Sequence, residues 1–369
     1  MGKKGQAKTV SSEPLPTQKD LEVRSLSISN TDGPILGSYS LMETLVMVQV
    51  NKIFFWHQKL GNWVFAGEVK REPFETATML GNSAGGVTDR EQSGVLYVEL
   101  WMCRNGSVSI LKASCYYYSA KENVLKHTYV DLESVLGEFR DVLFCILDDL
   151  SLFVCWSSTS VTSVGNTVYQ GNVKKYLLDW KLDKTLVSKD FMFTACTLKH
   201  LSCIGDSKSH VLGWSGQLLF LWNHMDCNDW TSLRLNHPGS ETRLKSSYLH
   251  WATLKQDNLF VVFEVDKCLE FKMVHLKTAS RKLICQFIIP ESYERMVGAV
   301  MVEDKLVATF SNGAVCWSLQ SFNLLAESEI KDAKRVFLGV EHIIIIGASS
   351  AIKTVPVEDC TKNSLCSAK

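Results

Sequence analysis

The sequence has neither an apolar stretch long enough to cross a membrane nor an excess of charge of either sign. Its purely apolar runs, such as the one within His342–Gly347, are far short of the roughly 20 residues that a transmembrane helix needs. The 39 Lys and Arg residues equal the 39 Asp and Glu residues, so no overall field draws the protein to nucleic acid or to an anionic membrane. We therefore expect a soluble protein with no membrane contact, which touches nucleic acid at most indirectly.

Proline is scarce, at 7 residues, while hydrophobic residues make up 46% of the chain. This composition excludes a mainly disordered or collagen-like protein. The twelve cysteines are scattered and mostly lie in apolar segments, which predicts reduced, buried thiols rather than a disulfide scaffold. The first eight residues are polar and lack the apolar core of a secretion signal. We expect a cytosolic or nuclear protein.

From Leu21 onward, runs of four to eight residues rich in Val, Ile, Leu, aromatic residues and Cys alternate with polar turns, a pattern typical of short β-strands. A strand, a polar turn and a further strand recur around positions 56, 111, 180, 222, 275, 317 and 355. Several of these intervals match the period of about 40 to 45 residues of a four-stranded propeller blade. Full Trp-Asp and Gly-His signatures are absent from nearly every repeat.

These repeats predict an all-β protein: a seven-bladed, degenerate WD40-like β-propeller spanning residues 21–358. The last repeat has only three strands, so we expect a strand within Leu21–Ile28 to complete it and close the ring. Residues 1–20, with Lys3, Lys4 and Lys8, are predicted to form a disordered basic tail, and 359–369 a second disordered tail. A pair of all-β sandwiches is the alternative fold. Large aromatics in strands are usually packing residues, so a structural role is expected for four tryptophans: Trp56, Trp180, Trp222 and Trp317.

Only Asp131–Glu138 has helical character, because an acidic first turn precedes about two turns of sequence. It is predicted to be a connector helix.

No motif predicts catalysis. The Gly81–Gly86 segment lacks the Lys-Ser/Thr pair that a phosphate-binding loop needs, and Gly213–Gly216 lacks the spacing of a nucleophile elbow. Asp148 and Asp149 are adjacent at a hairpin tip, where side chains point apart. We expect a non-enzymatic protein without cofactor.

Zinc-type ligands do occur, but not at zinc spacing. No close Cys-x-x-Cys pair is present. The segment with Cys196, His200 and Cys203 alternates like a strand, so these side chains need not face one another. No metal site is therefore predicted for the cluster formed by Cys196, His200, Cys203, His210, His224 and Cys227.

Several strings in the second half resemble a known family. They are Ser246–Ala252, Leu259–Phe263, Leu269–Thr278 and Gly298–Trp317. They are similar to the last blades of the carboxy-terminal propeller of the family of the partner and localiser of the breast-cancer-susceptibility-2 protein. The likeness is firmest over residues 205 to 330 and poor over 116 to 190. The family's coiled coil and central DNA-binding region have no counterpart in this sequence, which is therefore a shortened relative, a fragment or a different propeller.

The resemblance implies a scaffold of homologous-recombination DNA repair in the nucleus, which holds a short helix of the breast-cancer-2 protein in a groove between the fourth and fifth blades. Such a groove needs apolar pockets for the helix. The positions that match it are His210, Val211, Leu212, Trp214, Leu249, His250 and Trp251. Each such residue is more often propeller core than groove. The competing hypothesis is an unrelated propeller adaptor in a nuclear-pore, trafficking or ubiquitin-ligase complex.

Overall fold

The computed structural model describes most of the chain from Lys19 onward. The described residues are 19–20, 24–26, 35–41, 44–49, 52–57, 62–69, 77–88, 93–119, 124–147, 149–161, 167–179, 184–194, 198–204, 210–216, 218–223, 230–234, 248–265, 267–302, 304–338, 342–347 and 352–356. None of these residues is helical. Over the same residues, no helix is therefore present that could span a bilayer.

The strands form seven sheets, numbered here in chain order. Sheet 1 contains β3 (Ile35–Leu41), β4 (Thr44–Gln49), β5 (Lys52–His57) and β6 (Asn62–Glu68). Sheet 2 contains β7 (Ala77–Thr88), β8 (Ser93–Asn105), β9 (Val108–Ser119) and β10 (Val124–Leu136). Sheet 3 contains β11 (Arg140–Ile146), β12 (Leu152–Val161), β13 (Thr167–Asp179) and β14 (Lys184–Thr194).

The later sheets follow the same pattern. Sheet 4 contains β15 (His200–Ile204), β16 (His210–Trp214), β17 (Leu218–Asn223) and β18 (Trp230–Arg234). Sheet 5 contains β19 (Tyr248–Lys255), β20 (Asn258–Val265), β21 (Cys268–His275) and β22 (Arg281–Ile288). Sheet 6 contains β23 (Met296–Val302), β24 (Lys305–Phe310), β25 (Gly313–Ser318) and β26 (Leu324–Glu329). Sheet 7 contains β27 (Ala333–Leu338), β28 (His342–Gly347) and β29 (Ile352–Pro356).

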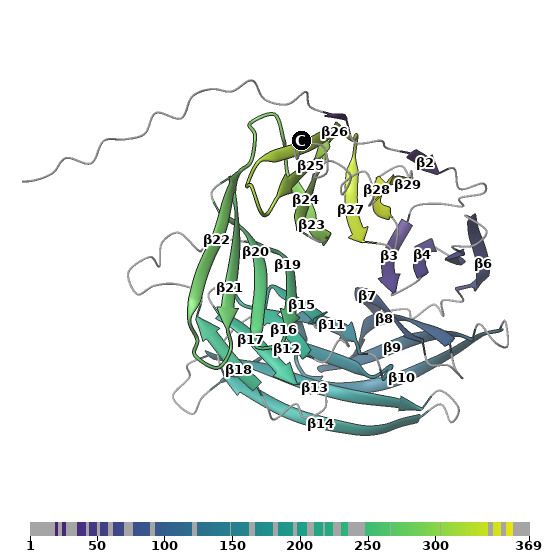
Figure 1. Ribbon diagram of the computed structural model, residues 1–369. Helices are drawn as coiled ribbons and strands as arrows, with labels where there is room; N and C mark the ends of the chain where they lie inside the picture. The colour runs from purple at the N-terminus through teal and green to yellow at the C-terminus, as the bar shows by residue number, and fades with distance from the viewer. Residues whose placement is uncertain are drawn as a thin grey trace, which may run out of the picture.

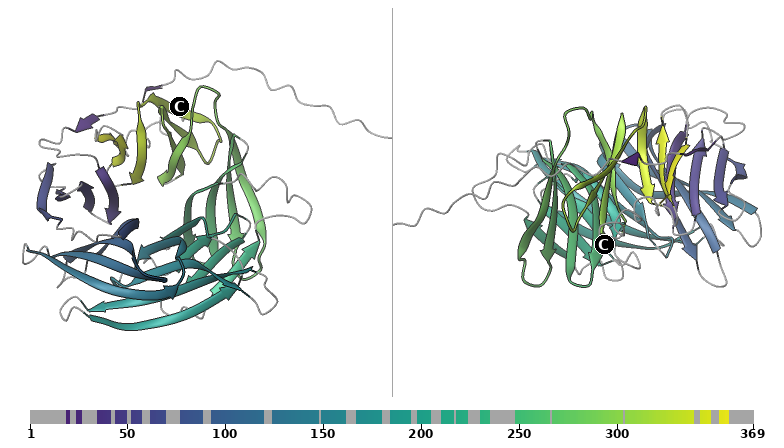
Figure 2. Two further views of the ribbon diagram at one scale, coloured as in Figure 1. Left: turned by 180° about the vertical axis from the view of Figure 1, so that it is seen from behind. Right: turned by 45° about the horizontal axis from the view of Figure 1, so that its top comes forward.

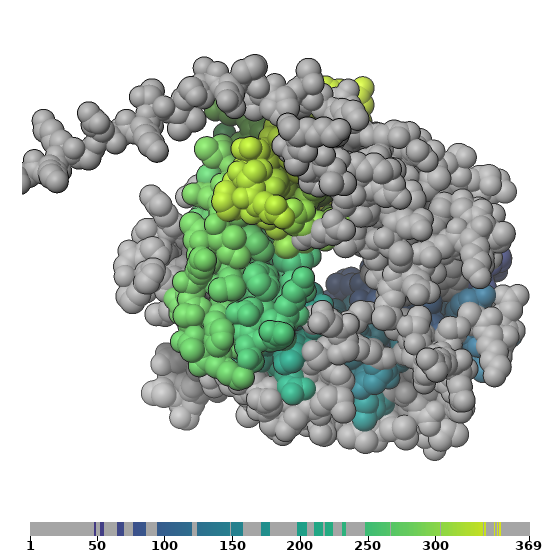
Figure 3. Space-filling model, viewed as in Figure 1, coloured from purple at the N-terminus to yellow at the C-terminus, as the bar shows by residue number. Residues whose placement is uncertain are grey.

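The sheets stand around a common centre, as Figures 1 and 2 show. The first strand of each sheet contacts the first strand of the next, and β27 of sheet 7 contacts β3 of sheet 1. Within each of the seven sheets, consecutive strands pair antiparallel. The space-filling view is hollowed near the middle, beside the residues of sheet 5 (Figure 3). The predicted all-β propeller is thus confirmed as the fold class.

The repeat expected from sequence coincides with the third strand of each sheet. Trp222 lies in β17, His275 ends β21 and Trp317 lies in β25. Trp56 lies in β5, although its side chain is outside the described part, and Trp180 is outside it altogether. The period that the sequence shows is therefore the period of the third strand.

The amino-terminal segment adds a strand to two sheets. β2 (Arg24–Leu26) pairs antiparallel with β29 and completes four strands in sheet 7, and it lies inside the segment expected to close the ring. β1 (Lys19–Asp20), which the sequence analysis assigned to the tail, pairs parallel with β26 of sheet 6. Figure 1 shows β2 beside β29, near the end of the chain. The rest of the two predicted tails lies outside the described residues.

From sheet 1 to sheet 7, a separate cluster of buried side chains fills the space between each sheet and the next. The cluster between sheets 3 and 4 contains Phe153, Val211 and Trp222, and the cluster between sheets 5 and 6 contains Phe271 and Trp317. Trp222 is 1% exposed and Trp317 5% exposed. These two tryptophans therefore join neighbouring sheets.

The connector helix predicted for Asp131–Glu138 is wrong. Those residues continue β10, which pairs with β9 as far as Leu136 with a bulge between Asp131 and Glu133. The acidic residues that suggested a helix start bind lysines instead: Asp131 lies 3.1 Å from Lys112 Nζ, and Glu133 lies 2.6 Å from Lys174 Nζ. Strand pairing and these ion pairs outweigh the weak local preference for a helix.

The role of the amino-terminal strands can be tested by truncation. Removing residues 1–18 leaves β1 and β2 in place, so the melting temperature and solubility should not change. Removing residues 1–30 exposes the outer edges of β26 and β29, and unpaired strand edges promote aggregation. We expect a lower melting temperature and larger particles in light scattering. Equal behaviour of the two truncations would contradict a closing role for the segment.

Trp222 and Trp317 should each be essential for stability. Replacing either with Ala leaves a cavity between two sheets, at a typical cost of about 3 to 5 kcal/mol in the free energy of unfolding. Phe322→Ala removes an aromatic ring that is 49% exposed and is the matched control. Urea unfolding measures all three, and a Trp317→Ala variant as stable as Phe322→Ala would refute this packing role.

Candidate functional site

The positions predicted to line a groove lie on two neighbouring sheets. His210, Val211, Leu212 and Trp214 are in β16 of sheet 4, while Leu249, His250 and Trp251 are in β19 of sheet 5. β15, the first strand of sheet 4, contacts β19. The assignment of these residues to the fourth and fifth blades therefore agrees with the topology.

Strand alternation sends these side chains to different places. Leu212, Trp214 and Leu249 belong to the cluster between sheets 4 and 5, and the Trp214 and Phe263 ring centroids are 4.9 Å apart. Val211 points the other way, into the cluster between sheets 3 and 4. These four predicted side chains are at most 8% exposed. They hold sheets together and offer almost no surface to a partner.

The other three predicted residues are partly accessible. His210 and His250 are half-buried, and Trp251 packs against the cluster between sheets 5 and 6. His250 Nε2 donates a hydrogen bond to Glu264 Oε2 at 2.7 Å. The accessible part of the predicted groove is thus polar, with His250 and Glu264 at its border, while Trp251 faces sheet 6.

His200 adds to this cluster from β15. Its Nε2 lies 3.1 Å from Ser202 Oγ. Burial lowers the pKa of His200 to about 4, and repulsion from His250 lowers it in the same direction. The imidazole of His200 is therefore neutral at pH 7. From the sequence alone, His200 stands out only as a zinc-type ligand.

The described residues contain no group of three or more His, Cys, Asp or Glu side chains arranged to hold a metal ion. His200 and Cys203 both lie in β15, whereas Cys196, His224 and Cys227 are outside the described part. Cys115 and Cys155 are buried thiols, and burial raises the pKa of each well above its usual value.

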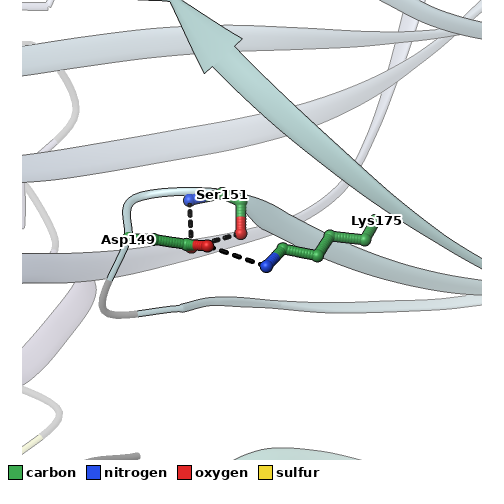
Figure 4. A network of polar contacts seen from close by, with 3 residues as sticks. All are labelled: Asp149, Ser151 and Lys175. Atoms are coloured by element: carbon green, nitrogen blue, oxygen red, sulfur yellow. Dashed lines mark hydrogen bonds and ion pairs between the residues drawn. The ribbon is translucent and has the colours of Figure 1, made fainter. Parts of the chain in front are cut away.

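Asp149, one of the two adjacent carboxylates, has a structural partner (Figure 4). Its Oδ2 accepts a hydrogen bond from Lys175 Nζ at 2.7 Å, and Oδ1 accepts bonds from the backbone N–H and hydroxyl of Ser151. Burial alone would raise the pKa of Asp149, but these hydrogen bonds outweigh it and hold the pKa below its usual value. This carboxylate fixes the turn between β11 and β12 and is committed to that role, while Asp148 lies outside the described residues.

A pocket of about 770 Å³ lies where β26 ends in sheet 6. The lining comes from the connection before β23, the turn between β24 and β25, and the end of β26. It includes Ser292, Tyr293, Asn312, Glu327, Glu329 and Lys331. Sequence reasoning missed this pocket because residues from three segments form it, and no motif links them.

Tyr293 is the side chain that organises the pocket. Its ring centroid lies 4.9 Å from that of Phe310, and its hydroxyl donates to Glu327 Oε2 at 3.1 Å. Burial raises the pKa of Tyr293 to about 12, supported by the hydrogen bond to Glu327 and the negative charge of Glu329. The phenol is therefore protonated at pH 7 and acts as a hydrogen-bond donor.

Gly313 makes room for this tyrosine. A Cβ atom at Gly313 would lie 2.4 Å from Tyr293 Cε1 and 2.9 Å from the carbonyl oxygen of Ser328. Those distances are too short, so any larger residue there would displace the tyrosine ring. Asn312 secures the same loop: its Nδ2 donates to the Ser292 carbonyl at 2.8 Å, and its Oδ1 accepts from the Glu294 N–H at 3.0 Å.

Comparison with solved structures finds propeller-type domains at very low sequence identity. The AfRom2 CNH domain is 9% identical and has a TM-score of 0.51, with 90% of this chain and 99% of that chain covered. BamB from Moraxella catarrhalis is 9% identical, with a TM-score of 0.48 over 92% of this chain and 100% of that chain. The WD40 domain of SCAP from fission yeast is 8% identical, with a TM-score of 0.45 over 89% and 85%.

At 9% identity, the similarity to the AfRom2 CNH domain supports the propeller fold and does not bear on function. No protein-family model matches the sequence, and no curated protein matches it. None of these findings links the chain to the family that its second half resembles.

The low pKa of His200 predicts a pH dependence of stability. An unfolded histidine takes up a proton near pH 6.5, whereas folded His200 does so only near pH 4. Protonation in this window therefore favours unfolding, and stability should fall as the pH drops from about 6.5 toward 4. His200→Gln should reduce this fall in urea-unfolding experiments at pH 7 and pH 5.

The control for this prediction is His275→Gln, which changes a histidine in contact with Thr278 at the surface. It should leave the pH dependence of the wild type in place. If His200→Gln and the wild type lose the same stability between the two pH values, the assignment of this effect to His200 is wrong.

Proposed function

We propose that this protein is a non-enzymatic scaffold that binds other proteins. The observation that carries the proposal is that its sheets accept additional chain at their outer edges, as β1 and β2 do on β26 and β29. Extended segments of other proteins can bind sheet edges by the same main-chain hydrogen bonds. Apolar side chains are also exposed on the outer strand β22, where Leu283 is 49% and Ile288 77% exposed.

The specific role that we propose is in homologous-recombination DNA repair in the nucleus. There, a short helix of the breast-cancer-2 protein would bind between sheets 4 and 5. This proposal rests on the family resemblance of residues 205 to 330. A buried donor also lies in the seam between those sheets: Trp214 Nε1 has no hydrogen-bond partner among the described residues.

An unpaired buried donor costs free energy, commonly about 1 to 3 kcal/mol. Trp214 is 1% exposed, so a partner at the surface does not reach this donor directly. Since Leu212 and Leu249 close the interior of the seam, the partner must enter at its accessible border, where His250 lies beside Glu264. The helix would then bind at the border of the sheets rather than deep between them.

The test needs two kinds of variant: one that disrupts folding and one that disrupts binding alone. Leu212 is fully buried, so Leu212→Arg places an unpaired charge in the core and should unfold the protein. His250→Ala changes the accessible border and should preserve folding, while binding of an amino-terminal peptide of the breast-cancer-2 protein falls by about tenfold or more. Fluorescence anisotropy measures binding, and circular dichroism melts measure folding.

Lys255→Gln, an exposed change at the other end of β19, is the matched control and should bind normally. If the wild type does not bind the peptide, the recombination role is wrong, and only the scaffold proposal remains. Immunoprecipitation with mass spectrometry provides the second test. Recovery of vesicle-coat or nuclear-pore subunits without recombination proteins would favour the adaptor hypothesis.

A further inference from the structure

We propose that the pocket at the end of β26 binds a lysine or arginine side chain presented by an extended segment of a partner protein. This site is in sheet 6, away from the seam between sheets 4 and 5, and it does not depend on the identity of the partner there. The proposal follows from the charge of the pocket, from its rigid wall, and from the strand that already lies beside it.

The charge of the pocket selects a cation. Glu327 and Glu329 are two residues apart in β26, so both side chains project from the same face of the strand. Glu291 and Glu294 flank Tyr293 in the sequence and add negative charge, while Lys331 is the one basic side chain among the described residues of the lining. A carboxylate pair binds ammonium or guanidinium groups through charge-assisted hydrogen bonds, which are the stronger kind.

The wall is fixed before any ligand arrives. Tyr293 donates to one oxygen of Glu327, which leaves the other oxygen to accept a hydrogen bond from a ligand. The tyrosine cannot shift inward, because it is held against Phe310 and over Gly313. Less conformational freedom is therefore lost on binding than at an ordinary surface carboxylate.

A metal ion does not fit this arrangement. The pocket offers two carboxylates, whereas no group of three or more metal-binding side chains occurs in the described part of the chain. Glu329 is exposed and Glu327 half-buried, so both are open to a side chain that arrives from solvent. The cation that suits the pocket is therefore an organic one.

The neighbouring strand indicates that the cation comes on a polypeptide. β1 lies along the outer edge of β26 and pairs with it at Ala326 and Glu327. This edge therefore accepts extended backbone directly beside the pocket. A bound segment could form main-chain hydrogen bonds with the remaining residues of β26 while its basic side chain enters between Glu327 and Glu329.

The test uses a short fluorescein-labelled peptide with one arginine between valine and threonine residues, and the full-length protein. The matched peptide carries citrulline, which has the shape of arginine without its charge. We expect the arginine peptide to bind in a salt-dependent manner and the citrulline peptide to bind about tenfold or more weakly, as loss of a charged hydrogen bond predicts. Equal binding of both peptides would overturn the proposal.

Glu327→Gln and Glu329→Gln should each weaken binding of the arginine peptide by a factor similar to that expected for citrulline. Glu291→Gln removes a nearby charge outside the lining, and it is the control for a general field effect. Tyr293→Phe keeps the ring and removes only the hydroxyl, so a smaller loss is expected, in line with a positioning role. Thermal melts of all four variants check folding.

Two results would contradict the proposal. If Glu291→Gln weakens binding as much as Glu327→Gln, the peptide is attracted by the overall negative charge of this surface and does not bind in the pocket. If agmatine, a free guanidinium compound, displaces the peptide at the concentration at which the unlabelled peptide itself does so, the site recognises a small amine rather than a protein segment. Neither result would affect the proposal for sheets 4 and 5.

Discussion

The fold depends on the burial of both faces of the middle strands in each sheet. In β16, Val211 packs toward sheet 3 while the next residue, Leu212, packs toward sheet 5. In β24, Leu306 belongs to the cluster shared with sheet 5 and Val307 to the cluster shared with sheet 7. A sheet that is apolar on both faces must have a neighbour on both sides. An arrangement of the sheets around a common centre gives each of these sheets a neighbour on both sides.

The same constraint limits where the protein can bind partners. Side chains between the sheets are used for packing, so recognition is left to the ends of the first strands and to the outer edges. The described polar groups follow this rule. His200 opens β15, Tyr293 precedes β23, and Glu327 lies on an outer strand. Their positions explain why the core residues of the predicted groove, such as Leu212, are poor candidates for direct contact.

Charged residues inside the sheets serve structure as much as function. Asp149 fixes a turn through Lys175 and Ser151, and Glu133 binds Lys174 across two sheets. Neither is distinguishable by residue type from the carboxylates of the pocket. What distinguishes Glu327 and Glu329 is that no lysine is paired with either of them among the described residues. Access and partners, rather than residue type, separate a structural carboxylate from a binding one.

The sequence by itself determined the all-β class, the repeat and the positions of the third strands, because strand alternation and turn residues are local properties of the chain. It also indicated that a strand near Arg24 would join the last sheet. Only the tertiary structure decided that residues 131–136 continue a strand, that Val211 and Leu212 face different sheets, and that Tyr293 meets Glu327. Those outcomes depend on contacts between residues far apart in the chain, such as the 34 positions that separate Tyr293 from Glu327, and no local pattern encodes them.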